Sequence, residues 1–405
     1  MQIQLYWRSW HGDEPLVLDF PDGYDVTLYP PAGGPDIGEE GIRRAFANPI
    51  GTPRLAELAR GKRSAVIVVD DIARPTPAYR LVPHILAELH AGGVPDENIK
   101  FLMAIACHRP MTREEMAKKL GEDVVRRYEV INHHPYEYLG YVGETSRGTP
   151  LYFSRHYLEA EMRLTIGQIS PHGGPGLSAG AKTVFPGVAG IETIYSNHKR
   201  GRLKGGLLVI EGNEWRADME EGVRMAGIDA IANVVVGGRR EILGLFVGDL
   251  VAAHRAGCKR ALEAMATPLP PQPVDVGIFN QYPKDTEFMH LGHALHVLNS
   301  AARPLVREGG TVVLVSASSD GYGFHSLEGR YMRSENKQPN PRLAGRNVII
   351  MCDTVNRRQL MDSTPPSARL VGDWCGVRAA LAELHPQGGS VAVFPCGAVQ
   401  LAAER

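Results

Sequence analysis

The sequence predicts an α/β protein with two α/β domains, each built on a largely parallel sheet. Short apolar runs alternate with amphipathic stretches along the 405 residues, which is the pattern of alternating strands and helices. A proline-rich segment at residues 267–273 (TPLPPQP) cannot continue a helix and marks the boundary between the domains. We therefore expect an N-terminal domain over residues 1–268 and a C-terminal domain over residues 269–405.

In the N-terminal domain, the apolar runs predict two units of strand, loop and helix. Buried strands are expected at residues 64–69 (SAVIVV) and 100–106, with one helix over 78–90 and another that begins after residue 112. Thr112 and Glu115 have the spacing of a capping box, which marks a helix start. The loops at 70–77 and 107–110 therefore follow strand ends, where open α/β sheets usually bind their ligands.

In the C-terminal domain, four apolar runs predict strands. They are separated by helix-length segments, so we expect a second parallel sheet there. The four runs are residues 274–280 (VDVGIFN), 311–318 (TVVLVSAS), 347–352 (NVIIMC) and 390–395 (SVAVFP).

Charge and composition favour a small-molecule site. Lys and Arg number 44 against 45 for Asp and Glu, so the net charge of −1 creates no general field for nucleic acid or an anionic membrane. The five cysteines include no C-x-x-C pair, which argues against a disulfide framework or a thiolate zinc site and fits a reducing compartment. No apolar run approaches the roughly 20 residues that a membrane helix needs. We expect a cytoplasmic protein with no nucleic-acid or membrane partner.

The segment from residue 167 to residue 198 carries the most reactive side chains. It holds His172, a stretch rich in Gly and Ser, Lys182, a Pro-Gly turn and His198. A Walker motif needs adjacent Gly and Lys, but Ala181 stands before Lys182. The small residues still allow backbone N–H groups to approach a phosphate. Taken alone, the segment is more typical of a flexible Gly-rich loop with a solvated lysine.

Four motifs in a fixed order make the chain resemble the nickel-dependent lactate racemase family. The motifs are Asn48-Pro49-Ile50-Gly51, Asp70 to Pro77 (DDIARPTP), His108 to Thr112 with Glu115, and His172 through Lys182 and Pro186-Gly187 to Asn197-His198. The resemblance covers most of the N-terminal two-thirds of the chain. It implies an isomerase, a racemase or epimerase of a small-molecule 2-hydroxy acid, with its active site in the cleft between the domains. The implied cofactor is the nickel-pincer nucleotide, nickel pyridinium-3,5-bisthiocarboxylic acid mononucleotide, covalently attached at Lys182.

The resemblance also implies a role for each reactive side chain. Lys182 would be joined to the nucleotide through a thioamide, His198 would be the protein ligand to nickel, and His108 and His172 would be paired acid–base residues. Neutral imidazole is a good ligand for nickel. An acid–base pair contributes only roughly 10²–10⁴-fold in rate, too little for an unactivated C–H bond. A hydride-accepting cofactor is therefore needed, with one histidine for each enantiomer.

The same resemblance supplies the rest of the expected site. Asp71, Arg74 and Thr76 lie in the signature loop that lines the cofactor and substrate cavity, and Arg74 would also bind the substrate carboxylate. Ser178 and Trp374 complete the expected cofactor-binding residues. Because the chain does not encode the synthesis of its cofactor, accessory biosynthetic proteins are implied as partners.

The sequence departs from the family near the expected substrate. Pro283 and Asp285 match, but His290 replaces a glutamine and His293 a lysine, beside Met289. A histidine is shorter than a lysine and largely neutral at pH 7, so the pocket should be roomier and less fixedly cationic. We therefore expect a substrate larger than lactate, with Met289, His290 and His293 among the residues that contact it. Smaller departures are Ala73, Cys107 and Ala179.

Two other functions remain open. The Asp70-Asp71 pair with the three motif histidines would also suit a metal-dependent hydrolase. A non-catalytic paralogue that binds a hydroxy acid or a nucleotide is the second alternative. A hydrolase site would leave Lys182 unmodified, whereas the racemase interpretation requires a covalent adduct there. The intact residues His108, His172, Lys182 and His198 argue against a non-catalytic paralogue.

Overall fold

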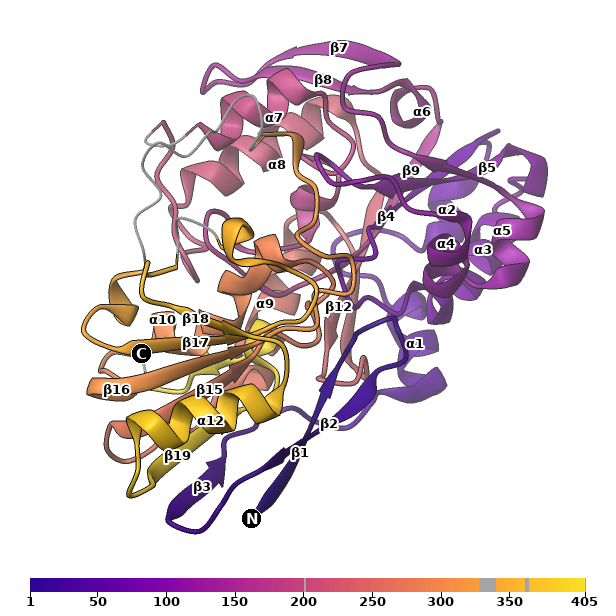
Figure 1. Cartoon of the computed structure of the whole chain (residues 1–405). Coiled ribbons are helices and arrows are strands. Elements are labelled where there is room, and N and C mark those ends of the chain that lie inside the picture. The colour runs from indigo at the N-terminus through magenta and orange to yellow at the C-terminus, as the bar shows by residue number, and fades with distance from the viewer. Residues whose placement is uncertain (200–201, 328–339, 361–363, 405) are drawn as a thin grey trace. The chain divides into compact units, whose positions relative to one another are not determined.

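The computed structural model describes residues 1–199, 202–327, 340–360 and 364–404, and the chain divides into two compact units (Figure 1). Within the described residues, unit 1 holds 1–33, 262–324 and those from 340 on, and unit 2 holds 34–261 and 325–327. Both units are α/β with largely parallel sheets, as predicted. Among the described residues, no helix has the length and apolar character needed to cross a membrane.

Unit 2 is built on a six-stranded sheet with the order β13-β12-β9-β4-β5-β6. The pairing is parallel throughout except between β12 and β13. The strands are β4 (Ala65–Asp70), β5 (Ile99–Ala104), β6 (Glu129–Asn132), β9 (Met162–Gln168), β12 (Ala230–Val236) and β13 (Ile242–Gly248). The helices are α1 (Gly38–Ala47), α2 (Leu55–Ala59), α3 (Val82–Ala91), α4 (Arg113–Leu120), α5 (Glu122–Arg127), α6 (Arg155–Leu158), α7 (Ile191–His198), α8 (Glu214–Ala226) and α9 (Ala252–Ala264).

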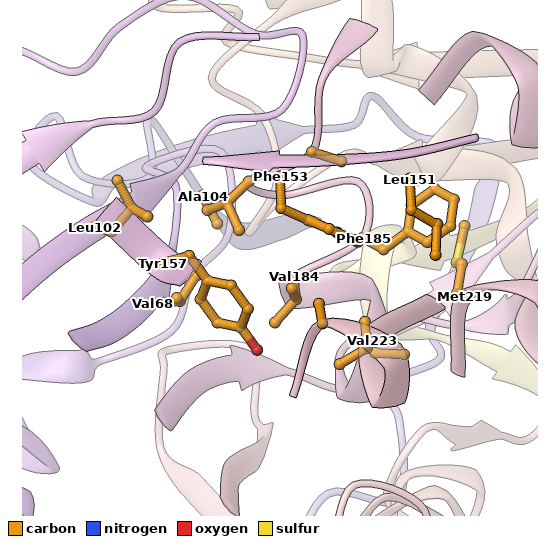
Figure 2. Packing of buried hydrophobic residues seen from close by; sticks show 14 of the residues in the cluster. Val68, Leu102, Ala104, Leu151, Phe153, Tyr157, Val184, Phe185, Met219 and Val223 are labelled. Carbon is orange, nitrogen blue, oxygen red and sulfur yellow. The ribbon is translucent and has the colours of Figure 1, made fainter. Parts of the chain in front are cut away.

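Short hairpins supplement this sheet. One pairs β7 (Leu139–Glu144) with β8 (Pro150–Ser154), and the other pairs β10 (Pro171–His172) with β11 (Gly176–Leu177). One core cluster of unit 2 lies between the sheet, the β7–β8 hairpin and helices α7 and α8. Figure 2 shows part of it, with the fully buried side chains Val68, Leu102, Phe153, Phe185 and Val223.

Unit 1 is built on a six-stranded, wholly parallel sheet with the order β18-β17-β16-β15-β19-β3. Its elements are β3 (Tyr24–Leu28), β15 (Val274–Asn280), β16 (Val306–Val315), β17 (Asn347–Met351), β18 (Arg369–Val371), β19 (Gly389–Phe394), α10 (His296–Ser300) and α12 (Trp374–Leu384). Antiparallel β1 (Gln2–Trp7) and β2 (Glu14–Asp19) and parallel β14 (Ala266–Thr267) and β20 (Leu401–Ala402) form two small sheets.

Period-two patterning explains the core of unit 1. Successive side chains of a strand point to opposite faces, and in β16 Val312 and Leu314 pack into one core cluster while Val313 and Val315 pack into another. Both faces of the sheet are therefore covered, as expected for a parallel sheet.

Most predicted elements are confirmed. The six predicted strands correspond to β4, β5, β15, β16, β17 and β19, and the predicted capping box opens α4 with both of its hydrogen bonds. The helix expected over 78–90 is interrupted: a 3-10 turn, η1 (Ala78–Arg80), precedes α3, which has proline in its first turn. Proline suits the start of a new helix and not the interior of a continuous one.

The two compact units do not have the same boundaries as the expected domains, 1–268 and 269–405. The chain changes unit after residue 261, close to the expected boundary, but residues 1–33 belong to unit 1. The physical reason is backbone pairing, because β3 forms the edge of the unit 1 sheet through parallel hydrogen bonds with β19.

Candidate active site

The candidate site of unit 2 lies where three neighbouring strands end. Strand β4 lies between β5 and β9, and all three run parallel. The chain proceeds from β4 to β5 on one side and reaches β9 on the other, so the strand order reverses at β4. Ligands in open α/β sheets bind at such a switch point, beyond the carboxyl ends of the strands. The loops that follow these strands carry Asp71 (after β4), His108 (after β5), and His172 and Lys182 (after β9).

The signature loop after β4 is held by Asp70, the last residue of that strand. Asp70 Oδ2 accepts hydrogen bonds from Thr76 Oγ1 at 2.5 Å and from the backbone N–H of Gln168 at 2.9 Å. Thr76 is fully buried. Thr76 was expected to line the cavity. In the structure its hydroxyl bonds to Asp70 and so attaches the loop to the end of β4.

Asp71 and His108 form a close buried pair. Asp71 Oδ2 lies 2.6 Å from His108 Nδ1, and the two side chains are 7% and 10% exposed. Burial acts to raise the pKa of Asp71, but His108, Arg74 and Lys119 together hold it below its ordinary value. The ionised carboxylate can only accept, so His108 donates through Nδ1, and Nε2 is the ring nitrogen that can take up a proton. This is the arrangement that a general base requires.

His325 is a neighbour of this pair that the sequence analysis missed. Its ring centroid lies 5.3 Å from that of His108. The next residue, Ser326, donates its backbone N–H to the Cys107 carbonyl at 2.9 Å, and Leu327 is buried in the unit 2 core. His325 lies in the segment that follows the strand predicted at residues 311–318. The general rule that ligand sites follow strand ends was the one signal in the sequence that could have identified it.

The Gly-Ser loop before Lys182 has a fixed shape. Ser178 Oγ donates to the Gln168 carbonyl at 2.6 Å and accepts from the backbone N–H of Ser170 at 2.9 Å. Ala179 and Gly180 both have φ of +59°, and a Cβ on Gly180 would lie 2.8 Å from the His254 ring. The hydroxyl of Ser178, expected to bind the cofactor, is therefore occupied in shaping the loop that leads to Lys182.

Lys182 lies in a 3-10 turn, η3 (Gly180–Thr183), and is half-buried. Desolvation, followed by the positive charge of Arg74, lowers its pKa to about 7. Asp71, Arg216 and Cys107 also influence its charge, so these groups lie around one site. At neutral pH, Lys182 is then a neutral amine in a substantial fraction of the molecules, and the neutral amine is the nucleophilic form.

His198 is the last residue of α7 and is oriented by its own helix. Its Nδ1 donates to the Ile194 carbonyl at 3.0 Å, which leaves Nε2 as the acceptor nitrogen. Desolvation, with a smaller contribution from Lys182, lowers the pKa of His198 to about 4. The ring is therefore neutral at pH 7, and it lies 5.4 Å from the Trp215 ring.

Trp215, which the sequence analysis also missed, connects His198 to the hairpin that carries His172. A Cβ on Gly174 would lie 1.5 Å from the Trp215 ring, so only glycine allows this packing. The backbone N–H of Gly174 donates to His172 Nδ1 at 3.3 Å. Unit 2 thus gathers Asp71, Arg74, His108, Lys182 and His198 around one site and holds His172 on an adjoining hairpin.

A buried polar network fixes the end of α7. Asp218 is fully buried and accepts hydrogen bonds from the hydroxyls of Thr145 and Thr149 at 2.6 and 2.7 Å, and from Asn197 Nδ2 at 2.7 Å. Asn197 immediately precedes His198. The network therefore limits movement of the helix turn that presents the His198 ring.

Three expected substrate residues belong to unit 1, in the 3-10 helix η4 (Phe288–Leu295). The rings of His290 and His293 stack with centroids 5.1 Å apart and an interplanar angle of 7°. His290 Nδ1 lies 3.1 Å from a Glu287 carboxylate oxygen. Met289, His290 and His293 are all half-buried.

Trp374, expected to bind the cofactor, is instead a core residue of unit 1. It is 6% exposed and its ring packs against Phe20 with centroids 5.2 Å apart. Its indole N–H donates to the Asp19 carbonyl at 2.9 Å. Both the ring and its polar group are therefore used within unit 1, so Trp374 is not retained among the candidate cofactor residues.

Within the described ranges, no three or more His, Cys, Asp and Glu side chains come together in a way that could hold a metal ion. A site in which one histidine completes the coordination of a metal-containing cofactor needs no such group.

Comparisons with known proteins agree with the motifs. Residues 11–205 match the model of the lactate racemase N-terminal domain. The chain is 32% identical over 300 residues to the lactate racemase of Lactiplantibacillus plantarum, covering 71% of this chain and 69% of that protein. It is 29% identical over 337 residues to the lactate racemase of Thermoanaerobacterium thermosaccharolyticum, covering 81% and 78%.

Two solved structures share the fold. The lactate racemase apoprotein of T. thermosaccharolyticum matches with a TM-score of 0.77 at 24% identity, over 99% of this chain and 100% of that one. A protein from Thermotoga maritima matches with a TM-score of 0.64 at 17% identity, over 90% and 98%. The sequence motifs, the extent of the identity and the shared fold establish that the chain belongs to the lactate racemase family.

Proposed function

We propose that this protein is a racemase or epimerase of a 2-hydroxy acid that uses a nickel-pincer nucleotide attached at Lys182. Membership of the lactate racemase family supports the reaction class. The observation that carries the proposal is the Asp71–His108 pair, in which an ionised carboxylate 2.6 Å from Nδ1 prepares a histidine for proton transfer. This pair lies in the same site as the half-buried amine of Lys182.

The residues around Lys182 fit such a cofactor. The lowered pKa of Lys182 makes its amine available for covalent attachment. His198 offers a neutral ring with Nδ1 already bonded to a carbonyl, which is how proteins commonly orient a histidine that ligates a metal through Nε2. Asp71 Oδ1 is buried and has no hydrogen-bond partner in the described chain. It is therefore available to a hydroxyl group of a bound molecule.

Three side chains carry out proton transfer and substrate binding in this proposal. When bound, the cofactor supplies a reversible hydride acceptor for the substrate Cα–H bond. His108 removes the hydroxyl proton of one enantiomer at Nε2 and returns it in the reverse reaction. His172 does the same for the other enantiomer, because the proton must be exchanged on both faces. Arg74 binds the substrate carboxylate, for which its planar fork of N–H donors is suited.

We further propose that the preferred substrate is larger than lactate. A lysine would supply a fixed positive charge with a long reach, and this chain has His293 in its place. The half-buried Met289 and the stacked rings of His290 and His293 offer an adaptable, partly aromatic surface. Such a surface favours a longer or aromatic side chain over a methyl group.

Two measurements test the proposal on protein produced together with the accessory proteins that make the cofactor. The intact mass should show one adduct that Lys182→Ala removes. Racemisation of an unlabelled 2-hydroxy acid in D₂O should give a product that keeps its Cα hydrogen, because the hydride is returned to carbon. Uptake of one solvent deuterium at Cα in each turnover would show direct proton abstraction and contradict the proposal.

A further inference from the structure

Lys119 is a fully buried lysine that none of the roles above uses. It lies on α4, is 0% exposed, and its ammonium reaches back to the signature loop after β4. Its Nζ pairs with Asp70 Oδ1 at 2.8 Å and donates to the carbonyls of Asp71 at 2.9 Å and Arg74 at 2.7 Å. One buried cation thus contacts three residues of a five-residue stretch.

Burial of this charge is unfavourable in itself. Desolvation lowers the pKa of Lys119 even though Asp70 acts in the opposite direction. A buried ion pair often gives no net gain in stability over apolar residues of the same volume. The adjacent Lys118 shows the usual alternative, because it lies at the surface and pairs with Glu114 at 3.0 Å. The position of Lys119 therefore calls for a reason other than stability.

The contacts supply that reason. The two backbone carbonyls that face Lys119 belong to Asp71 and Arg74, and the Arg74 N–H closes a turn onto the Asp71 carbonyl at 3.1 Å. Fixing these peptide groups fixes the directions in which both side chains leave the backbone. Asp71 then meets His108 Nδ1 at 2.6 Å.

We propose that Lys119 is a positioning residue for the acid–base site. It holds the signature loop so that the Asp71 carboxylate keeps the His108 proton on Nδ1 and keeps Nε2 as the base. The importance of this for turnover rests on the proposed function, but the effect on the His108 ring does not.

The test compares Lys119→Met, the matched surface variant Lys118→Met, and the double variant Asp70→Asn/Lys119→Met. Methionine keeps the unbranched stem without the charge, and the double variant leaves no buried aspartate without its cation. The first readout is the ¹⁵N chemical shifts of the His108 ring in protein without cofactor, assigned with a His108→Gln variant. These shifts report which ring nitrogen holds the proton. The second readout is kcat of the loaded enzyme.

We expect Lys118→Met to match the wild type in both readouts. In Lys119→Met and in the double variant, the ¹⁵N shifts of the His108 ring should no longer show the proton held on Nδ1, and kcat should fall at least tenfold. If Lys119→Met does not fold, the double variant decides. A folded double variant with the wild-type ring shifts and wild-type kcat would overturn the proposal. Altered shifts in a protein whose wild type has no racemase activity would support the positioning role and refute the proposed function instead.

Discussion

Replacing Asp71 by asparagine tests whether the carboxylate beside His108 takes part in catalysis. The side chain keeps its size but loses its charge, and the new amide can present an N–H group to His108 Nδ1. That contact would move the ring proton to Nε2, which could then no longer accept a proton from the substrate. We expect racemisation to slow strongly in a protein that remains folded.

The size of the effect follows from the 2.6 Å distance between Asp71 Oδ2 and His108 Nδ1. With charge centres about 4 Å apart and an effective dielectric constant of about 20, the carboxylate stabilises the protonated ring by about 4 kcal/mol. Because about 1.4 kcal/mol corresponds to a tenfold change in rate, kcat should fall by about 10³. The same exchange beside the histidine of a serine protease lowers kcat by about 10⁴.

The effect on stability should depend on pH with a defined sign. The folded-state pKa of Asp71 lies below the ordinary aspartate value of about 4. The charged carboxylate therefore stabilises the fold above about pH 4, and this contribution is lost as the pH falls through the folded-state pKa. The difference in unfolding free energy between wild type and Asp71→Asn should be greatest at neutral pH and decrease in acid.

The assay is the initial rate of racemisation by chiral chromatography, with intact mass to confirm the cofactor and denaturant unfolding to measure stability. Asp96→Asn is the matched control, because Asp96 Oδ1 also lies 2.6 Å from a histidine nitrogen, His90 Nε2, in an exposed pair. The control should keep the wild-type rate. An Asp71→Asn protein that carries the adduct and keeps more than about a tenth of the wild-type kcat would refute the reasoning.

Three further predictions address other parts of the site. In protein without cofactor, labelling of Lys182 by a small amine-reactive reagent should increase through about pH 7, as its lowered pKa requires, and a labelling rate that does not rise in this range would contradict the assignment. Ala179→Gly should raise the unfolding free energy by about 1–2 kcal/mol in denaturant titrations, because Ala179 has φ of +59° and ψ of −163°, while Gly180→Ala should lower it. His293→Lys should increase the rate on lactate relative to longer and aromatic 2-hydroxy acids in competition assays, and no change in this ratio would contradict the role given to His293.

The sequence predicted the parts of the fold that leave a local pattern. Strands β4 and β17 contain continuous apolar runs at residues 65–69 and 348–351, and the Thr112–Glu115 spacing marks a helix start directly. The placement of β3 leaves no such pattern. It joins the unit 1 sheet by pairing with β19, more than 350 residues later, and backbone hydrogen bonds of this kind are not encoded by neighbouring side chains.

The candidate site shows the same division between local and distant information. The motifs identified Asp71, His108 and Lys182, which all lie on loops after adjacent parallel strands. The sequence could not place His325 beside His108. His325 follows a strand of unit 1 in the chain but belongs to unit 2, and no local pattern in the sequence indicates this change of unit. The burial of Lys119 could not be predicted either, because the adjacent Lys118 has the same side chain and lies at the surface.

The adjacent carboxylates Asp70 and Asp71 show why residue types alone could not decide between chemistries. As a sequence pair they suit a hard metal ion as well as an acid–base site. Asp70 is the last residue of β4, and successive side chains at a strand end point to opposite sides. Asp70 accordingly bonds to Thr76 and pairs with Lys119, whereas Asp71 meets His108. Carboxylates with different partners in different directions are not arranged to share one metal ion: Asp70 holds the loop through Thr76 and Lys119, and Asp71 faces the His108 ring.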